Sequence, residues 1–324
     1  MGSRIPRREF LVSVGGLAAT AAASSLPAKA LLASEKLYPP ADLSYFDTPI
    51  SRGPARIRVG YAAITWNGND RQAIEDISAL GYPGIQLRSN CIAEFASPQE
   101  LRELLERKNL RMVAFSSGSV NIDPAVETDQ ISTAVAHAQF AHDVGGLYLQ
   151  ITDQRPKDRA ITPADYQRLG QLLTEIGKRT ADLGILVGYH NHMGTLGQRP
   201  EEVDQILQAS DPRYVKLLLD TGHYYQGGGD PAKAIEKYHD RLLFLHIKDV
   251  EELPHSTDPK HTYRWVELGQ GKEDIPAVFA ALRRVKFHGW VVVELDSEPD
   301  PSRTPKESAA MAEKYLEDRI GIKV

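Results

Sequence analysis

Three stretches of this chain share one pattern, an apolar run that ends in metal-binding types of side chain: ILVGYHNH at residues 185–192, VKLLLD at 215–220 and LLFLHIKD at 242–249. A fourth stretch, WVVVELD at 290–296, repeats the pattern near the C-terminus. Apolar runs of this kind are typical of strands buried on both faces, as in a parallel sheet. In a parallel barrel, the residue at the carboxyl end of a strand faces the functional site rather than the core. The four stretches therefore predict neighbouring barrel strands with a polar site at their ends.

The same alternation of apolar runs and amphipathic segments covers the chain from residue 57 onward. Eight strand–helix repeats predict an α/β fold, a single-domain (β/α)8 TIM barrel. A doubly wound open sheet is the alternative, but residues 65–69, after the first strand, lack the Gly-rich phosphate loop that usually marks it. The polar stretch 250–275 is predicted to be a loop bordering the site. The predicted strands are 57–64, 84–88, 112–116, 147–152, 186–190, 215–220, 243–248 and 290–294.

Several predicted helices begin with a capping residue followed by proline, which fits the first helical position. Glu100 stands three residues after Ser97 and predicts a capping box there. Helix ends are predicted at glycines 81, 145 and 184. The capped starts are Ser97-Pro98, Thr162-Pro163, Asp230-Pro231 and Thr304-Pro305.

The composition is that of an ordinary soluble domain. The 324 residues carry a formal net charge of −5 and 25% are charged, which suits one domain of about 250 residues with a full core. The mild acidity gives no basic surface for nucleic acid. Cys91 is the single cysteine, so the sequence excludes an intramolecular disulfide framework and a Cys-rich zinc site.

The N-terminus has the parts of an export signal in their usual order. Arg7-Arg8 precedes the apolar segment 10–23, and Ala28-Lys29-Ala30 fits a small-x-small cleavage site. The paired arginines resemble the twin-arginine signal, which exports folded proteins. We therefore expect a periplasmic protein, with no stable membrane insertion after cleavage, because no later apolar run approaches the ~20 residues that a span requires. The predicted parts are a twin-arginine signal peptide at 1–30, an N-terminal arm at 31–55 and the barrel at 56–324.

His190, Asp220, His246 and Glu294 end the fifth to eighth predicted strands. Adjacent strands of a barrel would bring them within reach of one ion. Two imidazoles and two carboxylates suit Mn²⁺, Co²⁺, Zn²⁺ or Fe²⁺ better than Ca²⁺. Such a cation polarises a carbonyl so that the adjacent C–H becomes acidic. His192 lies two residues after His190 and faces the same way, so either histidine is a candidate for the first ligand.

Each of these residues also has a simpler interpretation. Asp220 could cap the segment that follows it, His246 could be a hydrogen-bonded core histidine, and Glu294 could pair with an arginine. Four such residues at the ends of four consecutive strands favour the metal site over these separate explanations.

Other polar residues near the predicted strand ends are candidates for catalysis and substrate binding. We expect Glu294 or His192 to remove a proton, and His223 and Lys248 to stabilise the resulting oxyanion. Lys248 could instead pair with Asp249. An aromatic residue after the first strand is expected to stack on a sugar. The predicted substrate-binding residues are Trp66, Arg88, Gln150, Asn191 and Glu267.

Six segments carry a resemblance to a known family: HNHMGT at 190–195, DTGH at 220–223, GDP at 229–231, HIKD at 246–249, ELGQG at 267–271 and VELD at 293–296. In this order they resemble the xylose-isomerase-like sugar isomerase/epimerase superfamily over nearly all of residues 57–320. Segments 190–195 and 229–231 look most like inosose dehydratase. The resemblance implies a barrel with one divalent metal, commonly Mn²⁺ or Co²⁺ (with Zn²⁺, Mg²⁺ or Fe²⁺ also in use), and a small sugar or polyol substrate. It also implies proton transfer by glutamates of strands five and eight, but His190 occupies the strand-five position here.

The expected function is that of a metal-dependent sugar isomerase or epimerase, which forms an enediolate alpha to a carbonyl. The export signal favours a non-phosphorylated sugar or polyol. The alternative is an inosose-dehydratase-like dehydratase or lyase acting on a keto-polyol or keto-glycoside. A multi-zinc endonuclease would require ligands at strands two to four, where Arg88, Ser116 and Gln150 stand. A non-catalytic periplasmic sugar-binding protein is a further alternative. Helix-covered barrels often pair, so a homodimer is the expected oligomer.

Overall fold

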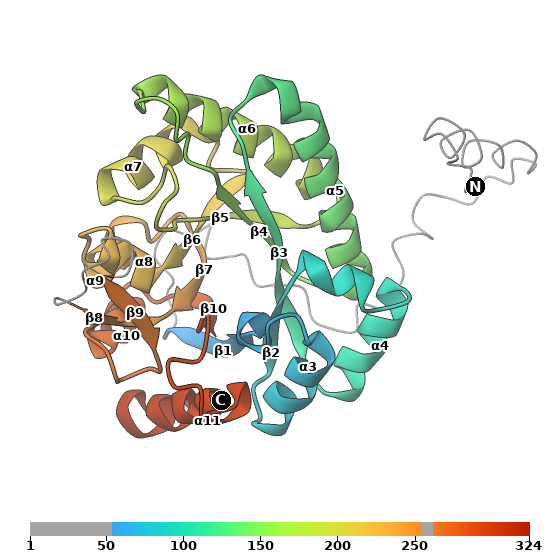
Figure 1. Ribbon diagram of the computed structural model, residues 1–324, viewed down its shortest axis with the longest axis vertical. Helices are drawn as coiled ribbons and strands as arrows, with labels where there is room; N and C mark the ends of the chain where they lie inside the picture. The colour runs from blue at the N-terminus through green and yellow to red at the C-terminus, as the bar shows by residue number, and fades with distance from the viewer. Residues whose placement is uncertain (1–53, 254–261) are drawn as a thin grey trace, which may run out of the picture. The chain divides into compact units, whose positions relative to one another are not determined.

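The structure, a computed structural model, describes residues 54–253 and 262–324. Eight parallel strands close into a barrel surrounded by helices (Figure 1). The strand order is β1-β10-β7-β6-β5-β4-β3-β2, so the last strand of the chain pairs with the first. The predicted (β/α)8 barrel is confirmed. The barrel strands are β1 (Arg56–Ala62), β2 (Gly84–Arg88), β3 (Arg111–Val120), β4 (Tyr148–Asp153), β5 (Leu186–His190), β6 (Val215–Asp220), β7 (Leu242–Ile247) and β10 (His288–Val293).

The helices lie on the outside of the barrel and pack against its strands. Three short 3-10 segments, η1 (Ala63–Trp66), η2 (Ser89–Ala93) and η3 (Pro124–Val126), interrupt the loops on the side of the strand ends. The helices are α3 (Asp70–Ala79), α4 (Pro98–Arg107), α5 (Glu127–Val144), α6 (Pro163–Ala181), α7 (Pro200–Ala209), α8 (Thr221–Gln226), α9 (Pro231–Lys237), α10 (Ile275–Arg284) and α11 (Pro305–Tyr315), followed by the π-helical turn η4 (Leu316–Ile320).

The core has two layers, one inside the barrel and one between the strands and the helices. Inside the barrel, Phe244 stacks on Tyr148 with ring centroids 5.3 Å apart. Gly188 makes room for this pair, because a Cβ there would lie 3.2 Å from a ring carbon of Phe244. The interior is thus filled by side chains up to the level at which the polar residues begin.

The helix starts follow the predicted caps with one exception. Thr162 and Thr304 form capping boxes with Asp165 and Glu307. Ser97 Oγ accepts the Glu100 N–H at 3.1 Å, but the Glu100 carboxylate accepts from the backbone of Ala96 and from Arg71 instead of Ser97. The predicted box at Ser97 is therefore only half formed, because an arginine competes for the glutamate.

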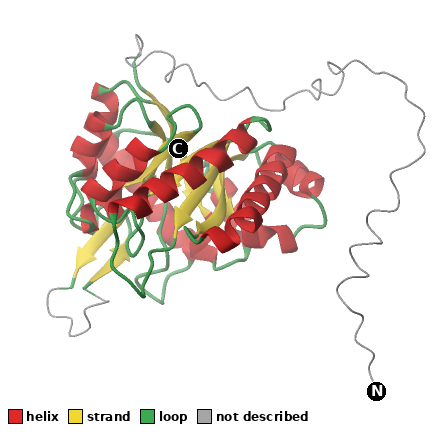
Figure 2. Ribbon diagram, turned by 90° about the horizontal axis from the view of Figure 1, so that it is seen from above, coloured by secondary structure: helices red, strands yellow, loops and turns green. Residues whose placement is uncertain are grey.

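The stretch 250–275, predicted to be a loop, contains a hairpin. β8 (Asp249–Glu252) pairs antiparallel with β9 (Tyr263–Val266), and the two strands project from the barrel (Figure 2). The hairpin brings an aromatic strand, Tyr-Arg-Trp-Val, back towards the strand ends. Its tip, residues 254–261, lies outside the described residues.

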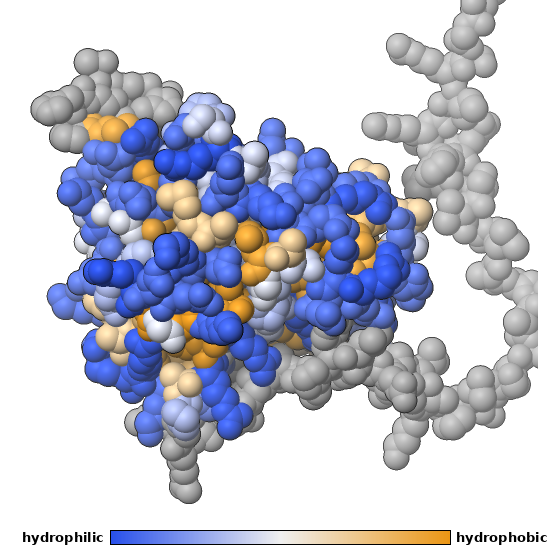
Figure 3. All heavy atoms as spheres, turned by 90° about the horizontal axis from the view of Figure 1, so that it is seen from below, coloured by the Kyte–Doolittle hydropathy of each residue, from blue (hydrophilic) through white to orange (hydrophobic). Residues whose placement is uncertain are grey.

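The predicted signal peptide and most of the arm also lie outside the described residues. No helix in the described part of the chain is both long and apolar enough to cross a membrane. The face seen in Figure 3 is mainly hydrophilic, with hydrophobic side chains in small groups among the polar ones.

Candidate active site

The stagger of the barrel strands brings the four predicted metal ligands together. His190 on β5 pairs with Leu218 on β6, so Asp220 lies two residues further along its own strand. Asp220 pairs directly with His246 on β7, and His246 pairs with Val292, two residues before Glu294. A step of two residues keeps a side chain on the same face of the sheet, and a closed barrel requires such stagger. All four side chains therefore point to one place.

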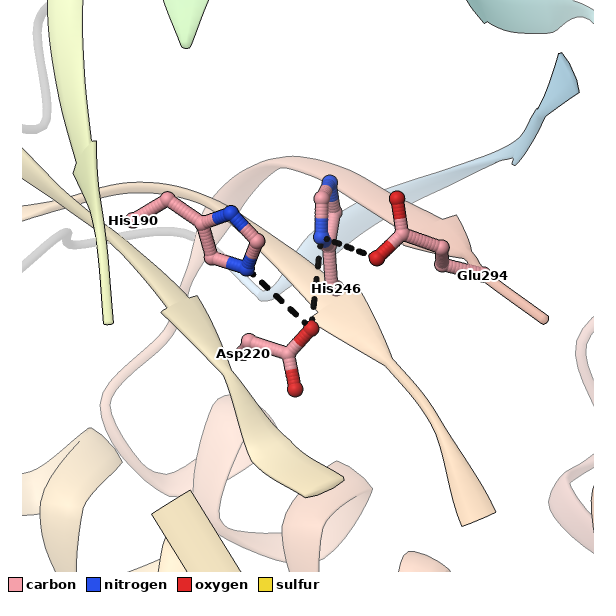
Figure 4. A group of neighbouring side chains, drawn as sticks. All are labelled: His190, Asp220, His246 and Glu294. Carbon is pink, nitrogen blue, oxygen red and sulfur yellow. Dashed lines mark hydrogen bonds and ion pairs between the residues drawn. The ribbon is translucent and has the colours of Figure 1, made fainter. Parts of the chain in front are cut away.

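The four side chains form a compact, buried cluster (Figure 4). Their ligand atoms all lie within 4.8 Å of one another. Asp220 Oδ2 lies 3.3 Å from His190 Nε2 and 3.4 Å from His246 Nδ1, which is 3.0 Å from Glu294 Oε2. Among the described residues, His246 Nδ1 has no hydrogen-bond partner in spite of these short distances. Ligand atoms that converge in this way, with one buried ring nitrogen left without a hydrogen-bond partner among the described residues, fit a bound cation.

The charge of the cluster also fits a divalent cation. Lys248 is fully buried, and its Nζ lies 2.8 Å from Glu294 Oε2, 3.5 Å from Asp220 Oδ2 and 3.1 Å from Asp296 Oδ1. One lysine thus faces three carboxylates, which leaves two negative charges when the histidines are neutral. Uncompensated buried charge is costly, so two further positive charges would stabilise this centre.

The surroundings shift the pKa values of these groups in opposite directions. Burial lowers the pKa of His190 to about 4, so this ring is neutral. Burial also disfavours the charged form of His246, but Glu294 and Asp220 raise its pKa to about 9. The pKa of the Lys248 ammonium is raised well above its ordinary value, because Asp220, Asp296 and Glu294 outweigh burial. The position of His246 thus favours positive charge, whether from a proton or from a metal.

Two glutamines support the histidines from behind. Gln150 Nε2 lies 2.8 Å from His190 Nδ1, and Gln86 Oε1 lies 2.8 Å from His246 Nε2. Gln86 Nε2 donates to Gln150 Oε1 at 2.5 Å. Gln150, predicted to bind substrate, instead orients His190, because both ends of its amide are used within the protein. Gln86 was not predicted; the signal for it is a polar residue in the middle of an otherwise apolar buried strand.

Asn191 also has a structural role in place of the predicted substrate contact. Its Nδ2 donates to the Asp220 carbonyl at 3.1 Å, and its Oδ1 accepts the Asp220 N–H at 2.9 Å. The side chain is completely buried. Asn191 therefore fixes the end of β6, and with it the Asp220 carboxylate.

His192, His223 and Lys248, three of the predicted catalytic residues, lie together beside the cluster. The rings of His192 and His223 are 3.6 Å apart, and His223 Nε2 lies 3.3 Å from Lys248 Nζ. His192 Nδ1 hydrogen-bonds the Met193 carbonyl at 2.7 Å, which turns this ring away from the four converging ligand atoms. Of these two histidines, therefore, His190 and not His192 belongs to the converging group.

Trp265 on β9 closes this group from the hairpin side and was not predicted. Lys248 Nζ lies 4.7 Å from the centre of its ring, and the ring of His223 meets it edge-on at 4.7 Å. Gly222 permits this approach, since a Cβ there would lie 2.9 Å from Trp265 and 3.0 Å from Lys248. Aromatic alternation within the polar stretch 250–275 was the signal for it.

The structure does not bring the remaining predicted substrate-binding residues to the cluster. Trp66 belongs to the outer layer, where its Nε1 donates to Asp76 on α3 at 2.9 Å. Arg88 ends β2 on the correct side but is exposed at the rim beside Asn90.

Glu267 is tied to the C-terminal part of the chain. It is buried and accepts hydrogen bonds from Arg303 at 2.6 Å and Ser308 at 3.0 Å. Asp249 does not pair with Lys248; it accepts backbone N–H groups of Gly269 and Gly271.

A cavity of about 880 Å³ adjoins the site at His192. Loops that follow β3, β4 and β5 line it, with Asn121, Gln154 and Arg155 among its polar residues. Its volume is of the size that holds a small organic molecule, and His192 is the one candidate catalytic residue among the described residues that line it.

Comparisons with known proteins agree with the barrel fold. Residues 74–315 match the family described as xylose isomerase-like TIM barrel. Inosose dehydratase of Lacticaseibacillus casei is 27% identical over 300 residues, which cover 82% of this chain and 98% of that protein. Among solved structures, the IOLI protein with a bound zinc atom has a TM-score of 0.70 at 19% identity, with 81% of this chain and 97% of that chain covered. An L-ribulose 3-epimerase has a TM-score of 0.67 at 16% identity over 81% of this chain and 93% of its own. The family match spans well over half of the sequence, and this chain belongs to the xylose isomerase-like TIM barrel family.

Proposed function

We propose that this protein is a divalent-metal-dependent dehydratase or lyase that acts on a non-phosphorylated keto-sugar or keto-polyol. The observation that carries the proposal is the buried His190–Asp220–His246–Glu294 cluster with Lys248 and two further histidines beside it. The names of relatives support the substrate class, since the family includes inosose dehydratases.

Asp220, His246 and Glu294, with His190 beside them, would hold the cation. When bound, the metal acts as a Lewis acid that polarises a ketone oxygen and makes the adjacent C–H acidic. Zinc is one candidate, as the IOLI protein was solved with that ion, and Mn²⁺ and Co²⁺ suit the same mixed ligand set.

His192 is the best candidate for the general base that removes the proton. Burial raises the pKa of the Glu294 carboxyl, but His246 and Lys248 hold it well below its usual range, which makes this carboxylate a weak base. His192 is half-buried and borders the cavity, and histidine is the side chain that most often serves as a general base.

Lys248 would stabilise the enediolate oxygen. Its charge is held at the site by three carboxylates, and Trp265 covers it from the hairpin side. An ammonium group in this position donates hydrogen bonds to developing negative charge without being consumed. His223, 3.3 Å from Lys248, orients this ammonium.

The difference between the two sides of the site favours elimination over isomerisation. Isomerases and epimerases in the family, by resemblance, use matched glutamates of strands five and eight. Here strand five ends in the buried His190 and strand eight in Glu294, so the groups at these two strand ends are chemically different. Such an arrangement suits a single base, His192, that removes the proton alpha to the ketone and then returns it to the leaving β-substituent. Sugar isomerisation or epimerisation remains the second candidate, because it shares the first step.

Proton exchange in D₂O tests the proposal. Purified protein with Mn²⁺ or Zn²⁺ is mixed with inosose, keto-sugars and 3-keto-glycosides, and the reaction is followed by NMR. We expect metal-dependent deuterium uptake alpha to the carbonyl together with loss of the β-substituent. Uptake with an isomer as product would establish the isomerase or epimerase instead. Bound metal with no uptake from any compound would favour a sugar-binding role.

Two histidine variants sharpen this test. His192→Gln should reduce uptake by at least about 100-fold, as expected for loss of a general base, and leave metal binding intact. His142→Gln, an exposed histidine on α5, is the matched control and should keep full activity. Normal exchange by the His192 variant would assign the base elsewhere.

A further inference from the structure

An unbroken chain of hydrogen bonds joins the outer ring nitrogens of the two clustered histidines. It runs from His246 Nε2 to Gln86 Oε1 at 2.8 Å, from Gln86 Nε2 to Gln150 Oε1 at 2.5 Å, and from Gln150 Nε2 to His190 Nδ1 at 2.8 Å. Each of the four side chains is at most 6% exposed. The chain crosses the barrel interior directly beneath the cluster, between strands β2, β4, β5 and β7.

The chemistry of an amide gives this chain a direction. A glutamine side chain offers a carbonyl that accepts and an NH₂ group that donates. Gln86 and Gln150 each use one group on a histidine and the other on their partner glutamine. If both amides rotate, the whole chain reverses. If only one rotates, two NH₂ groups or two oxygens face each other. In every intact arrangement, therefore, one histidine donates at its outer nitrogen and the other accepts.

This direction determines what each ring presents to the cluster. A neutral imidazole carries one N–H, and its other nitrogen has a lone pair. The histidine that donates to the chain turns a lone pair inward, as a metal ligand must. The histidine that accepts from the chain turns an N–H inward and does not bind a cation while it stays neutral.

The inner contacts select one of the two directions. His190 Nε2 lies 3.3 Å from Asp220 Oδ2 with hydrogen-bond geometry, which suits an inward N–H. His246 Nδ1 has no hydrogen-bond partner among the described residues, which suits an inward lone pair. The reverse direction would turn the Nε2 lone pair of His190 towards Asp220 Oδ2 and lose this buried hydrogen bond, which is unfavourable.

We infer that the Gln86–Gln150 pair makes His246 a metal ligand and keeps His190 as a hydrogen-bond donor to Asp220. The inference rests on the metal site of the proposed function and refines it to three protein ligands, Asp220, His246 and Glu294. Catalytic metal sites commonly have three protein ligands and keep a position open for substrate. Gln86 and Gln150 are thus positioning residues that preserve this open position.

Zinc titration by calorimetry tests the inference without reference to activity. His246→Gln removes a ligand and should weaken Zn²⁺ binding by at least about 100-fold, more than loss of a second-shell partner does. His190→Gln keeps a donor next to Asp220 and should change the affinity by no more than about 10-fold, the lower limit for such supporting residues. Equal losses in the two variants would overturn the inference. Thermal melts of the metal-free variants show whether each is folded.

Ring-nitrogen NMR of the zinc-loaded protein gives a second, independent readout. We expect His190 as the Nε2–H tautomer and His246 as the Nε2–H tautomer with a metal-bound Nδ1. Gln150→Glu can accept from both neighbours, so it should convert His190 to the Nδ1–H tautomer and add it as a ligand. Gln150→Met, which cannot accept from His190, should not. Metal-bound nitrogen on both histidines of the wild-type protein would contradict the inference.

These outcomes are separable from the proposed function. Zinc binding with the expected difference between the two variants, but no deuterium uptake, would disprove the function and keep the ligand assignment. Deuterium uptake by a protein that depends equally on both histidines for zinc binding would support the proposed function and disprove the assignment of His246 alone as the histidine ligand.

Discussion

Lys248 shows how a single residue controls the charge of the site. Among the described residues, it is the one lysine or arginine that contacts Asp220, Glu294 and Asp296. Removal of one partner from a buried ion pair leaves the other charge uncompensated, at a cost of about 3–5 kcal/mol. Lys248→Met should therefore lower the free energy of unfolding of the metal-free protein by about that amount. Urea unfolding in the presence of EDTA measures it.

Bound metal should offset part of this loss, because it supplies positive charge at the same place. The control is Lys237→Met, which removes an exposed pair with Asp204 and should cost less than about 1 kcal/mol. If Lys248→Met is as stable as this control without metal, the three carboxylates are not held by the lysine.

His246 should make the stability of the metal-free protein depend on pH. Its pKa in the folded protein is about 9, compared with 6.5 ordinarily, so the folded state binds the proton more tightly. This contribution, about 3 kcal/mol, is fully present below pH 6.5 and is lost as the pH rises to 9. The stability difference between the wild type and His246→Gln should shrink over that range in urea unfolding with EDTA. A difference that stays constant from pH 6.5 to 9 would contradict the raised pKa.

The residue-scale predictions from sequence succeeded where chain position alone decides the location of a side chain. His190, Asp220, His246 and Glu294 end buried strands, so the barrel must gather them. Trp66 follows the first strand closely, but the chain turns into the η1 helix and carries the indole outward to Asp76. Gln86 acquires its role only through its contacts with Gln150 and His246, which lie 64 and 160 positions further along the chain. Such pairings carry no local signal.

At the scale of elements, α8 and the β8–β9 hairpin meet at a glycine. A Cβ at Gly222 would lie 2.9 Å from Trp265, closer than real Cβ atoms approach, and 3.0 Å from Lys248, which is tighter than most. Gly222→Ala should push Trp265 and Lys248 out of position and lower kcat/KM by about 10- to 100-fold, as small misplacements at active sites do. Steady-state kinetics on the substrate found by NMR measures this.

Gly184→Ala is the matched control for this substitution. Gly184 has φ +72° and nothing within 4 Å of a Cβ, so alanine there strains only the backbone. It should reduce stability by about 1 kcal/mol and leave kcat/KM unchanged. Equal kinetic losses in the two variants would mean that the contact of Gly222 with Trp265 and Lys248 is unimportant.

The elements themselves were largely predictable, because each has local causes. The strands β2, β5 and β6 have the predicted bounds, and proline after a capping residue marks the start of α4, α6, α9 and α11. The β8–β9 hairpin was missed because its strands are four residues long and polar residues dominate the stretch around them. Its position depends on Asp249, which fixes the loop through Gly269 and Gly271 rather than through sequence-local turns.

For the whole molecule, the barrel explains why the chemistry concentrates at one end. Eight strands point their carboxyl ends the same way, and stagger between them raises Asp220 and Glu294 to the level of the histidines. The cavity at His192 opens on this side. A folded, metal-loaded barrel of this kind would suit the twin-arginine route, which exports folded proteins.

We propose a periplasmic location for this molecule and expect export to depend on the paired arginines. The motif Arg7-Arg8 is followed by the apolar segment 10–23 and the small-x-small site at 28–30. Replacement of both arginines by lysine should retain the full-length chain in the cytoplasm, since that pathway recognises the pair. Cell fractionation with mass spectrometry of the N-terminus measures this; the wild type should begin after Ala30. The lysine variant should still form metal-binding barrels in the cytoplasm, because the four residues of the cluster lie between positions 190 and 294 and are unchanged. Undiminished export of the lysine variant would show that another route carries the protein.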